Sequence, residues 1–196
     1  MLTSQSSSRV RILEKSVLKM TRLFTALEIP DPVKEELSRI EPKGDNIKLP
    51  AQPHITLHFI GNVSHIMANA ICSELKNVES KCYTQKISGV GAFYHRKAPF
   101  CLWAGVDKCH GLNALYSAVG FALGRLGLDL GIREYKPHIT IARLKSSNEK
   151  YVQSYISNHA NFKTSFSVKS FCLYTSEFEQ GKAVYTKVQE YNLIKN

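Results

Sequence analysis

The spacing of hydrophobic residues predicts an alternation of strands and helices from about residue 20 onward. Short segments in which every second residue is apolar, bounded by proline, glycine or asparagine, are typical of half-buried strands. Segments in which apolar residues recur three and four positions apart are typical of helices with one buried face. The predicted strands are 22–29, 53–60, 84–90, 100–106, 137–143, 166–174 and 182–192, and the predicted helices are 33–40, 65–78, 112–126 and 148–158.

Capping and turn residues mark several of these boundaries. Asp31 is suited to cap the first helix because Pro32 then falls in its first turn. Ser64 is suited to cap the second helix. The polar segment 42–50 is predicted to be a loop, and Gly61 is predicted to close the second strand.

The order strand, helix and histidine-bearing strand occurs twice, in residues 23–60 and again in residues 102–143. A duplicated lobe explains such a repeat. We therefore predict a single α+β domain over residues 20–196. Its two lobes would place two antiparallel sheets across a central cleft, with helices on the outer faces.

The tetrapeptide Pro-His-Ile-Thr begins one predicted strand in each lobe. Side chains of a strand alternate between its two faces, so each histidine shares a face with the threonine two residues on. The isoleucines point the other way, toward the helices. If a pseudo-twofold axis relates the lobes, His54 and Thr56 meet His138 and Thr140 in one pocket.

Two histidines and two threonines suit the cleavage of a phosphodiester. Histidine titrates near pH 6.5, so one ring can accept a proton while the other donates one. Attack on phosphorus needs such a pair on opposite sides, and each proton transfer contributes roughly 10²–10⁴ in rate. Threonine hydroxyls can donate to the non-bridging phosphate oxygens. In a cyclic phosphate the leaving oxygen stays tethered to its ribose, so the chemistry requires no metal cofactor.

A His-x-Thr pattern alone is weak evidence, because a lone strand histidine is usually packed or solvated. Zinc is the main chemical alternative, since histidine is its common neutral ligand. His58 is predicted to share the face of His54 and could supply a third ligand, so zinc stays open. The repeated context favours an acid–base pair.

The chain carries 26 lysine and arginine residues against 16 aspartate and glutamate residues, a formal charge of +10. A field of this sign attracts polyanions, which supports a nucleic-acid partner without identifying it. Five scattered cysteines with no Cys-x-x-Cys pair argue against a cysteine zinc site or a disulfide framework, and favour a reducing cytoplasm. No apolar run reaches the roughly 18–20 residues that span a bilayer, so we expect a soluble, cytoplasmic protein.

Residues 1–19 differ in composition from the rest of the chain. They are rich in serine and basic residues, as organellar transit segments are, but lack the apolar region of a signal peptide. Met20 lies two residues before the first predicted strand. We therefore expect residues 1–19 to be a disordered basic tail from an upstream start codon, outside the domain.

Several segments together resemble one known family. They are RLFTALEIP, HITLHFIG, GAF, LWAGV, PHITIARLK and LYTSEF with GKAVYT. From Arg22 to about Leu193 the chain resembles the two-histidine phosphoesterase superfamily. Within it, the resemblance is to the bacterial and archaeal RNA 2′,3′-cyclic phosphodiesterases once called 2′-5′ RNA ligases.

This resemblance implies hydrolysis of RNA ends that carry a 2′,3′-cyclic phosphate, yielding 2′-phosphomonoesters, with His54 as proton donor and His138 as proton acceptor. It also implies that Arg143 contacts phosphate or ribose. Strict alternation turns Arg143 away from His138, so this role requires a bulge or a strand end. His58 departs from the apolar or basic residue usual at its position. We expect it either to tune the pKa of His54 or, more simply, to be solvated.

Further substrate contacts are predicted near the motifs, each with a structural alternative. Phe24 could flank the pocket or belong to the core. Phe93 opens a predicted loop, 93–97, that mixes aromatic and cationic residues as RNA-binding segments do, or it is the one buried aromatic of a solvated loop. Tyr135, with Lys136, could reach RNA from the cleft rim. Three more positions match the family and are expected chiefly to hold the closing hairpin: Tyr174, Ser176 and Tyr185.

Three other functions stay open. The same site could run in reverse and ligate RNA ends through a 2′-5′ linkage. A non-catalytic RNA- or nucleotide-binding module is disfavoured, because binding alone needs no pair of titrating histidines. A cyclic phosphodiesterase for small molecules is disfavoured by the net charge and by the segment 93–97. We expect a monomer that acts on RNA without a membrane or an obligate protein partner.

Overall fold

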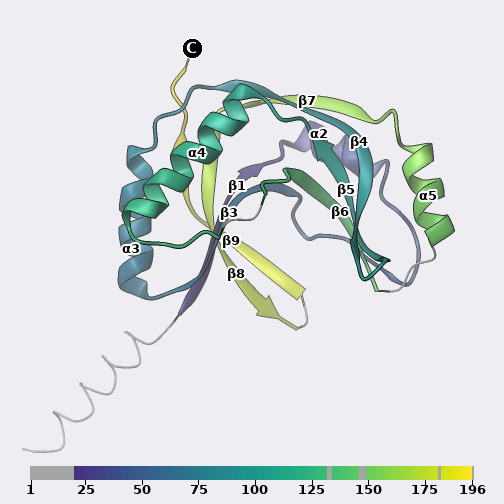
Figure 1. The fold of residues 1–196 in the computed structure, drawn as a ribbon, viewed down its shortest axis with the longest axis horizontal. Helices are drawn as coiled ribbons and strands as arrows, with labels where there is room; N and C mark the ends of the chain where they lie inside the picture. Colours follow the sequence, from purple (N-terminus) through teal and green to yellow (C-terminus); the bar gives the residue numbers. More distant parts are fainter. Residues whose placement is uncertain (1–19, 132–133, 146–148, 181, 196) are drawn as a thin grey trace, which may run out of the picture.

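A computed structural model describes residues 20–195 apart from 132–133, 146–148 and 181, so the predictions for residues 1–19 and for the helix start at 148 lie outside the described residues. Figure 1 shows a curled sheet with helices on its outer side. The strands are β1 (Thr21–Glu28), β2 (Ile47–Lys48), β3 (His54–Val63), β4 (Tyr83–His95), β5 (Ala98–Val106), β6 (His138–Leu144), β7 (Lys163–Val168), β8 (Ser170–Glu179) and β9 (Lys182–Asn192). The helices are α2 (Asp31–Ser38), α3 (His65–Glu74), α4 (His110–Arg125) and α5 (Glu149–Asn158), with a short 3₁₀ helix at Leu75–Asn77.

The strands form one antiparallel sheet in the order β7-β4-β5-β6-β3-β1-β8-β9, with β2 paired to β6. The α+β class is confirmed. The two predicted sheets are the halves β4–β5–β6 and β3–β1–β8, and they are joined at their centre by the pair Ile55 and Ile139. These two residues hold equivalent positions in the two tetrapeptides. Their pairing places the axis that relates the halves between the two motifs.

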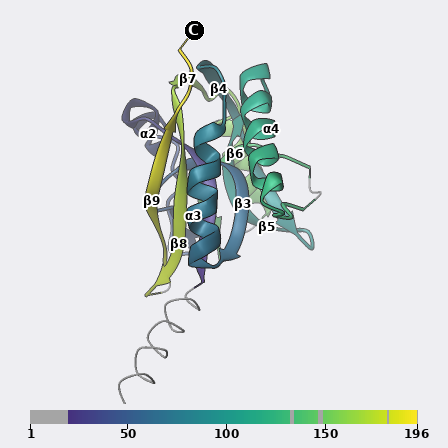
Figure 2. The same ribbon diagram turned by 90° about the vertical axis from the view of Figure 1, so that its left-hand side faces the viewer.

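The hydrophobic core lies between the outer face of the sheet and the helices. Helix α3 packs on β1, α4 packs on β3 and β4, and α5 packs on β4 and β5. Figures 1 and 2 show α3 and α4 side by side on this face. The isoleucines of both motifs are fully buried there, as the strand alternation predicts.

The predicted helices are confirmed, with one correction to a cap. The Oγ of Ser64 accepts the backbone N–H of Met67 at 3.2 Å and so caps α3. The N-cap of α2 is Pro30 and not Asp31. Asp31 instead forms an ion pair with Lys34 at 2.8 Å.

The segment 166–174, for which the sequence predicts one strand, forms parts of two. Lys169 separates β7, which pairs with β4, from β8, which pairs with β1. Because β7 and β8 belong to opposite halves of the sheet, this single residue brings the two halves together. The sheet is therefore curled, with a concave inner face.

Two predicted turns are also corrected. Strand β3 continues past Gly61, whose φ of 88° bends the strand without ending it. Residues 93–95 belong to β4, and the turn of the β4–β5 hairpin consists of Arg96 and Lys97, both with positive φ. The predicted loop 42–50 contains the short strand β2. None of the described helices is long and apolar enough to cross a membrane.

Candidate active site

Both motif histidines are held by the same local hydrogen bond. The Nδ1 of His54 lies 2.9 Å from the carbonyl oxygen of Gln52, and the Nδ1 of His138 lies 2.8 Å from that of Lys136. A carbonyl oxygen can only accept, so each Nδ1 carries a proton and each neutral ring presents an unprotonated Nε2. The residue two positions upstream therefore fixes the tautomer of each histidine.

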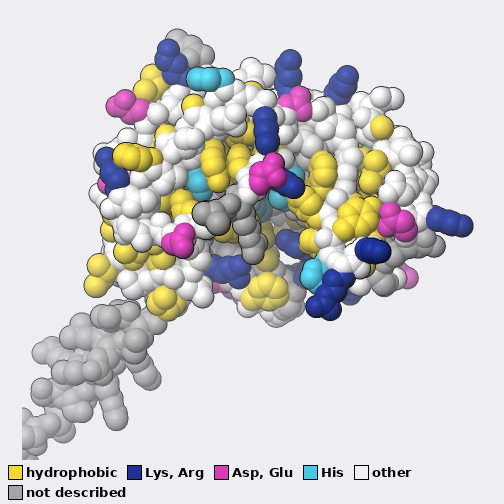
Figure 3. Space-filling view, in the orientation of Figure 1, with side chains coloured by type: hydrophobic (Ala, Val, Ile, Leu, Met, Phe, Trp, Pro, Cys, Tyr) yellow, Lys and Arg dark blue, Asp and Glu magenta, His cyan; other side chains and the backbone are white. Residues whose placement is uncertain are grey.

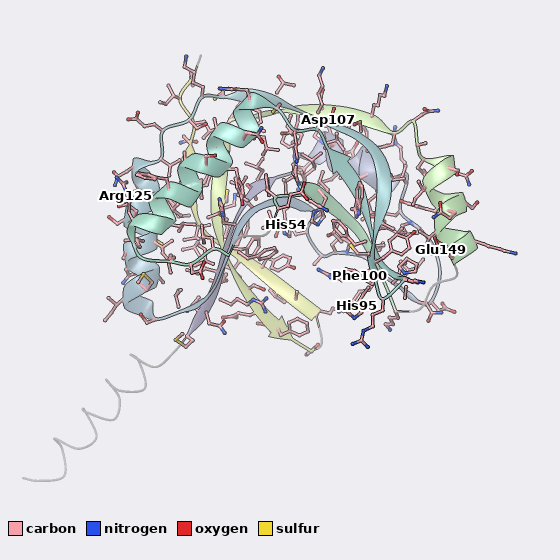
Figure 4. The ribbon with its side chains drawn as sticks, viewed as in Figure 1. His54, His95, Phe100, Asp107, Arg125 and Glu149 are labelled. Atoms are coloured by element: carbon pink, nitrogen blue, oxygen red, sulfur yellow. The ribbon has the colours of Figure 1, made fainter. Side chains whose placement is uncertain are left out.

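The histidines and threonines of both motifs face the concave side of the sheet. His54, Thr56, His138 and Thr140 are all half-buried, whereas the residues between them are fully buried on the helix side. Figure 4 shows His54 within the curl of the sheet, and Figure 3 shows histidine surface in the hollow of this face. The predicted sharing of one face is confirmed.

The surroundings of both rings disfavour the charged form. Burial lowers the pKa of His54 below its ordinary value near 6.5, against the opposing effect of the Gln52 carbonyl, and the positive charges of His138 and Arg143 lower it further. Burial likewise lowers the pKa of His138, and Arg143 adds to the effect. In the free protein at pH 7, both rings are therefore mainly neutral. An anion bound between them would favour protonation.

A bulge follows each motif at the same position. In β3, Thr56 pairs with Ala26 but His58 pairs with Thr25, so Leu57 is the extra residue. In β6, Thr140 pairs with Trp103 but Ala142 pairs with Leu102, which makes Ile141 the equivalent extra residue. Each bulge reverses the alternation of the residues that come after it.

The bulge in β3 overturns the prediction for His58. Its side chain points to the helix side, where it is only 6% exposed, and its Nε2 lies 2.8 Å from the carbonyl oxygen of Tyr116 on α4. The ring also stacks on the ring of Tyr116. His58 is therefore neither solvated nor beside His54. It cannot complete a zinc site with His54, because the two rings lie on opposite faces of the strand.

The bulge in β6 has the opposite consequence for Arg143. The bulge returns Arg143 to the concave face, as its predicted role requires. There Arg143 is the cross-strand neighbour of Cys101 in β5. Its charge acts on the pKa of both His54 and His138, so the guanidinium lies within electrostatic reach of both rings. The equivalent residue of the other half is Phe59, which is 66% exposed.

Aromatic rings pack against His54 from its own half of the sheet. The centroid of Phe24 lies 5.2 Å from that of His54, and the edge of Tyr185 meets the same ring at 5.2 Å and 85°. Phe24 is buried together with Tyr174 in a small cluster on the concave side. Phe24 therefore both flanks the histidine and belongs to a local core. Tyr185, for which the sequence predicts chiefly a role in the hairpin, is in addition a direct neighbour of His54.

A pocket of about 260 Å³ opens beside His138. Phe93 lies edge-on to His138 at 4.8 Å and 5.5 Å from the ring of Trp103. The residues that line the pocket are Phe93, Trp103, Gly105, Val106, Lys108, Lys136, Pro137 and His138. Trp103 is not among the predicted site residues, since an aromatic residue in an apolar strand is usually core. In the sequence, Trp103 stands two residues before Gly105, so the two share one face of the strand, and a glycine beside a large ring is a pattern that could have indicated a pocket on that face.

Tyr135 lies against the core and not at an open rim. Its ring stacks on Tyr116 at 3.9 Å, and its hydroxyl donates to the backbone carbonyl of Thr56 at 3.2 Å. Tyr135 stands three residues before His138, so its hydrogen bond to Thr56 connects the segment before the second motif with the first motif. Tyr135 is therefore suited to position the motifs rather than to touch RNA.

Among the described residues, one group of three potential metal ligands lies close together, namely Glu28, Cys172 and Glu190. The Nζ of Lys187 lies 2.6 Å from a carboxylate oxygen of Glu28, so this group already contains its counter-ion. Neither motif histidine belongs to it.

Residues 29–179 match the family model of the 2′-5′ RNA ligase superfamily, which covers the larger part of the chain and both histidine motifs. The chain belongs to this superfamily.

Two relatives named RNA 2′,3′-cyclic phosphodiesterase illustrate the similarity. One from Geobacillus stearothermophilus is 30% identical over 83% of this chain and 54% of its own length, so the chain spans about half of that relative. One from Aquifex aeolicus is 26% identical over 90% of this chain and 99% of its own length. The structure of E. coli LigT complexed with 3′-AMP has a TM-score of 0.76 at 23% identity, covering 89% of this chain and 99% of LigT, which shows a shared fold.

Proposed function

We propose that this superfamily member hydrolyses RNA ends that carry a 2′,3′-cyclic phosphate and releases 2′-phosphomonoesters. The observation that carries the proposal is the matched pair of Nδ1–carbonyl bonds at His54 and His138, which leaves two Nε2 atoms available on one concave face. The names of the relatives support the substrate class. The formal charge of +10 suits a polyanionic RNA.

In the proposed step, the Nε2 of His138 accepts a proton from water as the water oxygen attacks phosphorus. The bond from phosphorus to O3′ breaks, and the protonated Nε2 of His54 gives its proton to O3′. The hydroxyls of Thr56 and Thr140 donate to the non-bridging oxygens, where negative charge increases. Burial lowers the pKa of both rings, so their surroundings do not distinguish the acid from the base. The assignment of His54 as acid and His138 as base therefore follows the family pattern.

The negative charge of the bound substrate keeps the acid protonated. The phosphodiester is an anion, and an anion between the rings raises the pKa of a nearby histidine. Arg143 contributes a fixed positive charge on the same face, which binds the phosphate while disfavouring a second proton on the histidines. One protonated and one neutral ring is then the favoured state of the complex.

The ribose of the leaving group lies on the side of His54 in this mechanism. That side presents the exposed ring of Phe59, whose centroid is 6.1 Å from that of Phe24, and the edge of Tyr185. These rings offer apolar surface to the terminal nucleoside.

The test is turnover of an oligonucleotide with a 2′,3′-cyclic phosphate end in the presence of EDTA. We expect a 2′-phosphate product without added metal. His54→Ala and His138→Ala should each lower kcat by at least about 10²-fold. His65→Ala, a change of an exposed histidine on the outer helix α3, is the matched control. Absence of turnover contradicts the activity, and loss of turnover in EDTA contradicts the metal-free mechanism.

A second experiment tests the direction of proton transfer. A cyclic substrate with sulfur in place of the bridging O3′ has a leaving group that needs no protonation. This substrate should restore activity to His54→Ala and not to His138→Ala, because only the acid becomes dispensable. Rescue of His138→Ala alone would reverse the two assignments.

A further inference from the structure

The β8–β9 hairpin extends beyond the rest of the sheet. Strand β8 pairs with β1 only as far as Thr175, and past that residue it pairs with β9 alone (Figure 1). This part of the hairpin carries Phe178, which is 75% exposed, more than any other large hydrophobic residue that the structure describes. A single exposed ring is common on protein surfaces, so its meaning depends on the face it occupies and on its neighbours.

Phe178 lies on the concave face, on the same side as His54. The register of β8 with β9 is uninterrupted from Tyr174 to the end of the strand, so Tyr174, Ser176 and Phe178 share a face. Tyr174 belongs to the buried cluster on the concave side. Tyr185, the cross-strand neighbour of Ser176, meets the ring of His54 on that side. The exposed ring of Phe178 is therefore directed to the side of the sheet that carries the motif histidines.

Aromatic surface connects His54 with this end of the hairpin. The centroid of Tyr185 lies 5.2 Å from that of His54. Phe178 is the diagonal neighbour of Tyr185 across the two strands, and diagonal neighbours lie about 7–8 Å apart, a distance that aromatic side chains span. The direct neighbour of Phe178 is Ala183, whose methyl group leaves the ring open to solvent. With the exposed ring of Phe59, these residues form an apolar surface that leads away from His54.

A cation and a hydroxyl lie on the same face. Ser176 comes one residue beyond the last position at which β8 pairs with β1, and Arg22 is its counterpart in β1. Leu23 is buried in the core on the helix side, so the adjacent Arg22 faces the concave side, where it is exposed. The two carboxylates near the end of β8, Glu177 and Glu179, alternate to the other face. Positive charge next to aromatic surface is typical of sites for single-stranded nucleic acid.

The proposed mechanism places the rest of the RNA chain on this side. The ribose of the leaving group lies beside His54, because the attacking water comes from the side of His138. The terminal ribose is joined through its O5′ to the phosphate of the preceding nucleotide. That nucleotide therefore continues away from the reacting phosphorus, past Phe59 and Tyr185. The surface beyond these two rings is the end of the β8–β9 hairpin.

We propose that the end of the β8–β9 hairpin is a subsite for the second-to-last nucleotide of the RNA. The inference rests on the proposed function, which sets the side of the leaving ribose. The ring of Phe178 stacks on the base of this nucleotide, and the guanidinium of Arg22 binds the phosphate that joins it to the terminal nucleotide. A cyclic mononucleotide lacks this part of the chain. The subsite therefore favours RNA ends over small cyclic phosphates, with little preference among bases, because stacking tolerates every base.

Binding of reaction products tests the subsite without turnover. Titration calorimetry compares 2′-AMP with a diadenosine dinucleotide that ends in a 2′-phosphate. The wild type should bind the dinucleotide about tenfold more tightly, which corresponds to about 1.4 kcal/mol and is within the range for one stacked base. Phe178→Ser should remove this difference, and Phe178→Trp should keep it. Equal Kd values for the two ligands in the wild type, or no binding of the dinucleotide at millimolar concentration, would overturn the proposal.

A dinucleotide whose upstream residue lacks its base separates the two contacts. It keeps the linking phosphate, so Arg22→Gln should weaken its binding, whereas Phe178→Ser should not. For the complete dinucleotide, Arg22→Gln should reduce the dependence of log Kd on log salt by about 0.7, the value for one phosphate contact on a single strand. Arg39→Gln, at the exposed end of α2, is the matched control for charge. A salt dependence that is the same in both variants would contradict the phosphate contact.

Turnover tests the consequence for substrate choice. Phe178→Ser should lower kcat/KM for a dinucleotide with a cyclic phosphate end about tenfold, and for 2′,3′-cyclic AMP by no more than about twofold. Phe121→Ser, which removes a 69% exposed ring from the outer helix α4, is the matched control and should change neither value. Equal losses on both substrates, in a protein whose circular dichroism matches the wild type, would contradict the subsite. Absence of turnover on both substrates would refute the proposed function, while product binding still decides the subsite.

Discussion

The hydroxyl of Tyr135 donates a hydrogen bond of 3.2 Å to the backbone carbonyl of Thr56 and so joins the two histidine motifs. Burial raises the pKa of Tyr135, which keeps the phenol neutral and able to donate. The ring is stacked on Tyr116, and Tyr116 is stacked on His58. A continuous set of rings therefore connects the second motif, helix α4 and the first motif.

Tyr135→Phe removes this hydrogen bond and keeps the stacked ring. We expect a loss of about 1 kcal/mol in the free energy of unfolding. We also expect kcat to fall several-fold with little change in KM, because the distance between the two histidines is set partly by this contact. Urea unfolding and steady-state kinetics on a cyclic-phosphate substrate measure the two effects.

The control for this change is Tyr151→Phe, which removes a hydroxyl from a 41% exposed ring on α5. Both its stability and its kcat should stay near wild type. If Tyr135→Phe loses stability but keeps its kcat, the bond is structural only and the positioning role is wrong.

Arg143→Gln removes a charge that lowers the pKa of both histidines. The pKa values of His54 and His138 should rise in this variant, and the optimum of kcat/KM should move to higher pH. The maximal rate should fall, because the phosphate loses its cation. The measurement is kcat/KM between pH 4.5 and 9.

Arg39→Gln removes an equal charge from the exposed end of α2 and is the control for net charge. Its pH optimum should match that of the wild type. An Arg143→Gln optimum that stays in place, or moves to lower pH, would contradict the electrostatic role.

The motif residues and their common face could be predicted from the sequence, because two-residue periodicity decides which side chains share a face over a short distance. Four residues from His54 to Leu57 obey it, and so do the four from His138 to Ile141. The duplication also suggested an axis that relates the two motifs, but the direct pairing of their strands at Ile55 and Ile139 was not predicted.

The bulges could not be predicted from the residue pattern alone, and they decide which face of the sheet His58 and Arg143 occupy. Leu57 and Ile141 are ordinary strand residues, and no glycine or proline marks either position. Strict alternation therefore placed His58 beside His54, which is wrong. For Arg143 the family pattern conflicted with alternation, and that conflict was itself the signal for a bulge.

The pairing of strands that are distant in the sequence also limited what could be predicted about the fold. The segment 166–174 is largely apolar and contains no glycine or proline, so it was predicted to be one strand. The break at Lys169 exists because β7 pairs with β4 while β8 pairs with β1. The adjacent polar residues Lys169 and Ser170 interrupt the alternation at this point, but only the pairing with distant strands shows that the chain passes there from one half of the sheet to the other.

The stability of the protein should fall at acidic pH because burial lowers the pKa of His54, His58 and His138. The unfolded chain has histidine pKa values near 6.5, so below that pH it binds protons that the folded protein does not yet bind. The free energy of unfolding should therefore be steady above about pH 7.5 and decrease as pH falls through 6.5 toward the lower folded values. Urea titrations at pH 7.5 and 5.5 measure the difference.

His58→Phe isolates one of these three contributions. It removes the hydrogen bond to the carbonyl of Tyr116, so the variant should be less stable at pH 7.5. Its loss of stability between pH 7.5 and 5.5 should nevertheless be smaller than that of the wild type, because one fewer buried ring must be protonated. An equal or larger loss would show that His58 is not part of the acid sensitivity.

Gly91→Ala tests whether the indole of Trp103 must lie flat on the sheet. A Cβ atom at this position collides with Cη2 and Cζ2 of Trp103, and the centroid of the Phe93 ring lies 5.5 Å from that of the indole ring. Overpacking of this kind costs about 1–3 kcal/mol, and we expect that loss together with a shift of the tryptophan emission as the ring moves toward solvent. Gly124→Ala is the control, since no atom lies within 4 Å of its added Cβ and alanine favours a helix, so that variant should be as stable as the wild type or more so. Because Trp103 is the only tryptophan of the chain, its emission reports on this position alone, and unchanged emission with unchanged stability in Gly91→Ala would show that the close contact between Gly91 and the indole does not fix the ring.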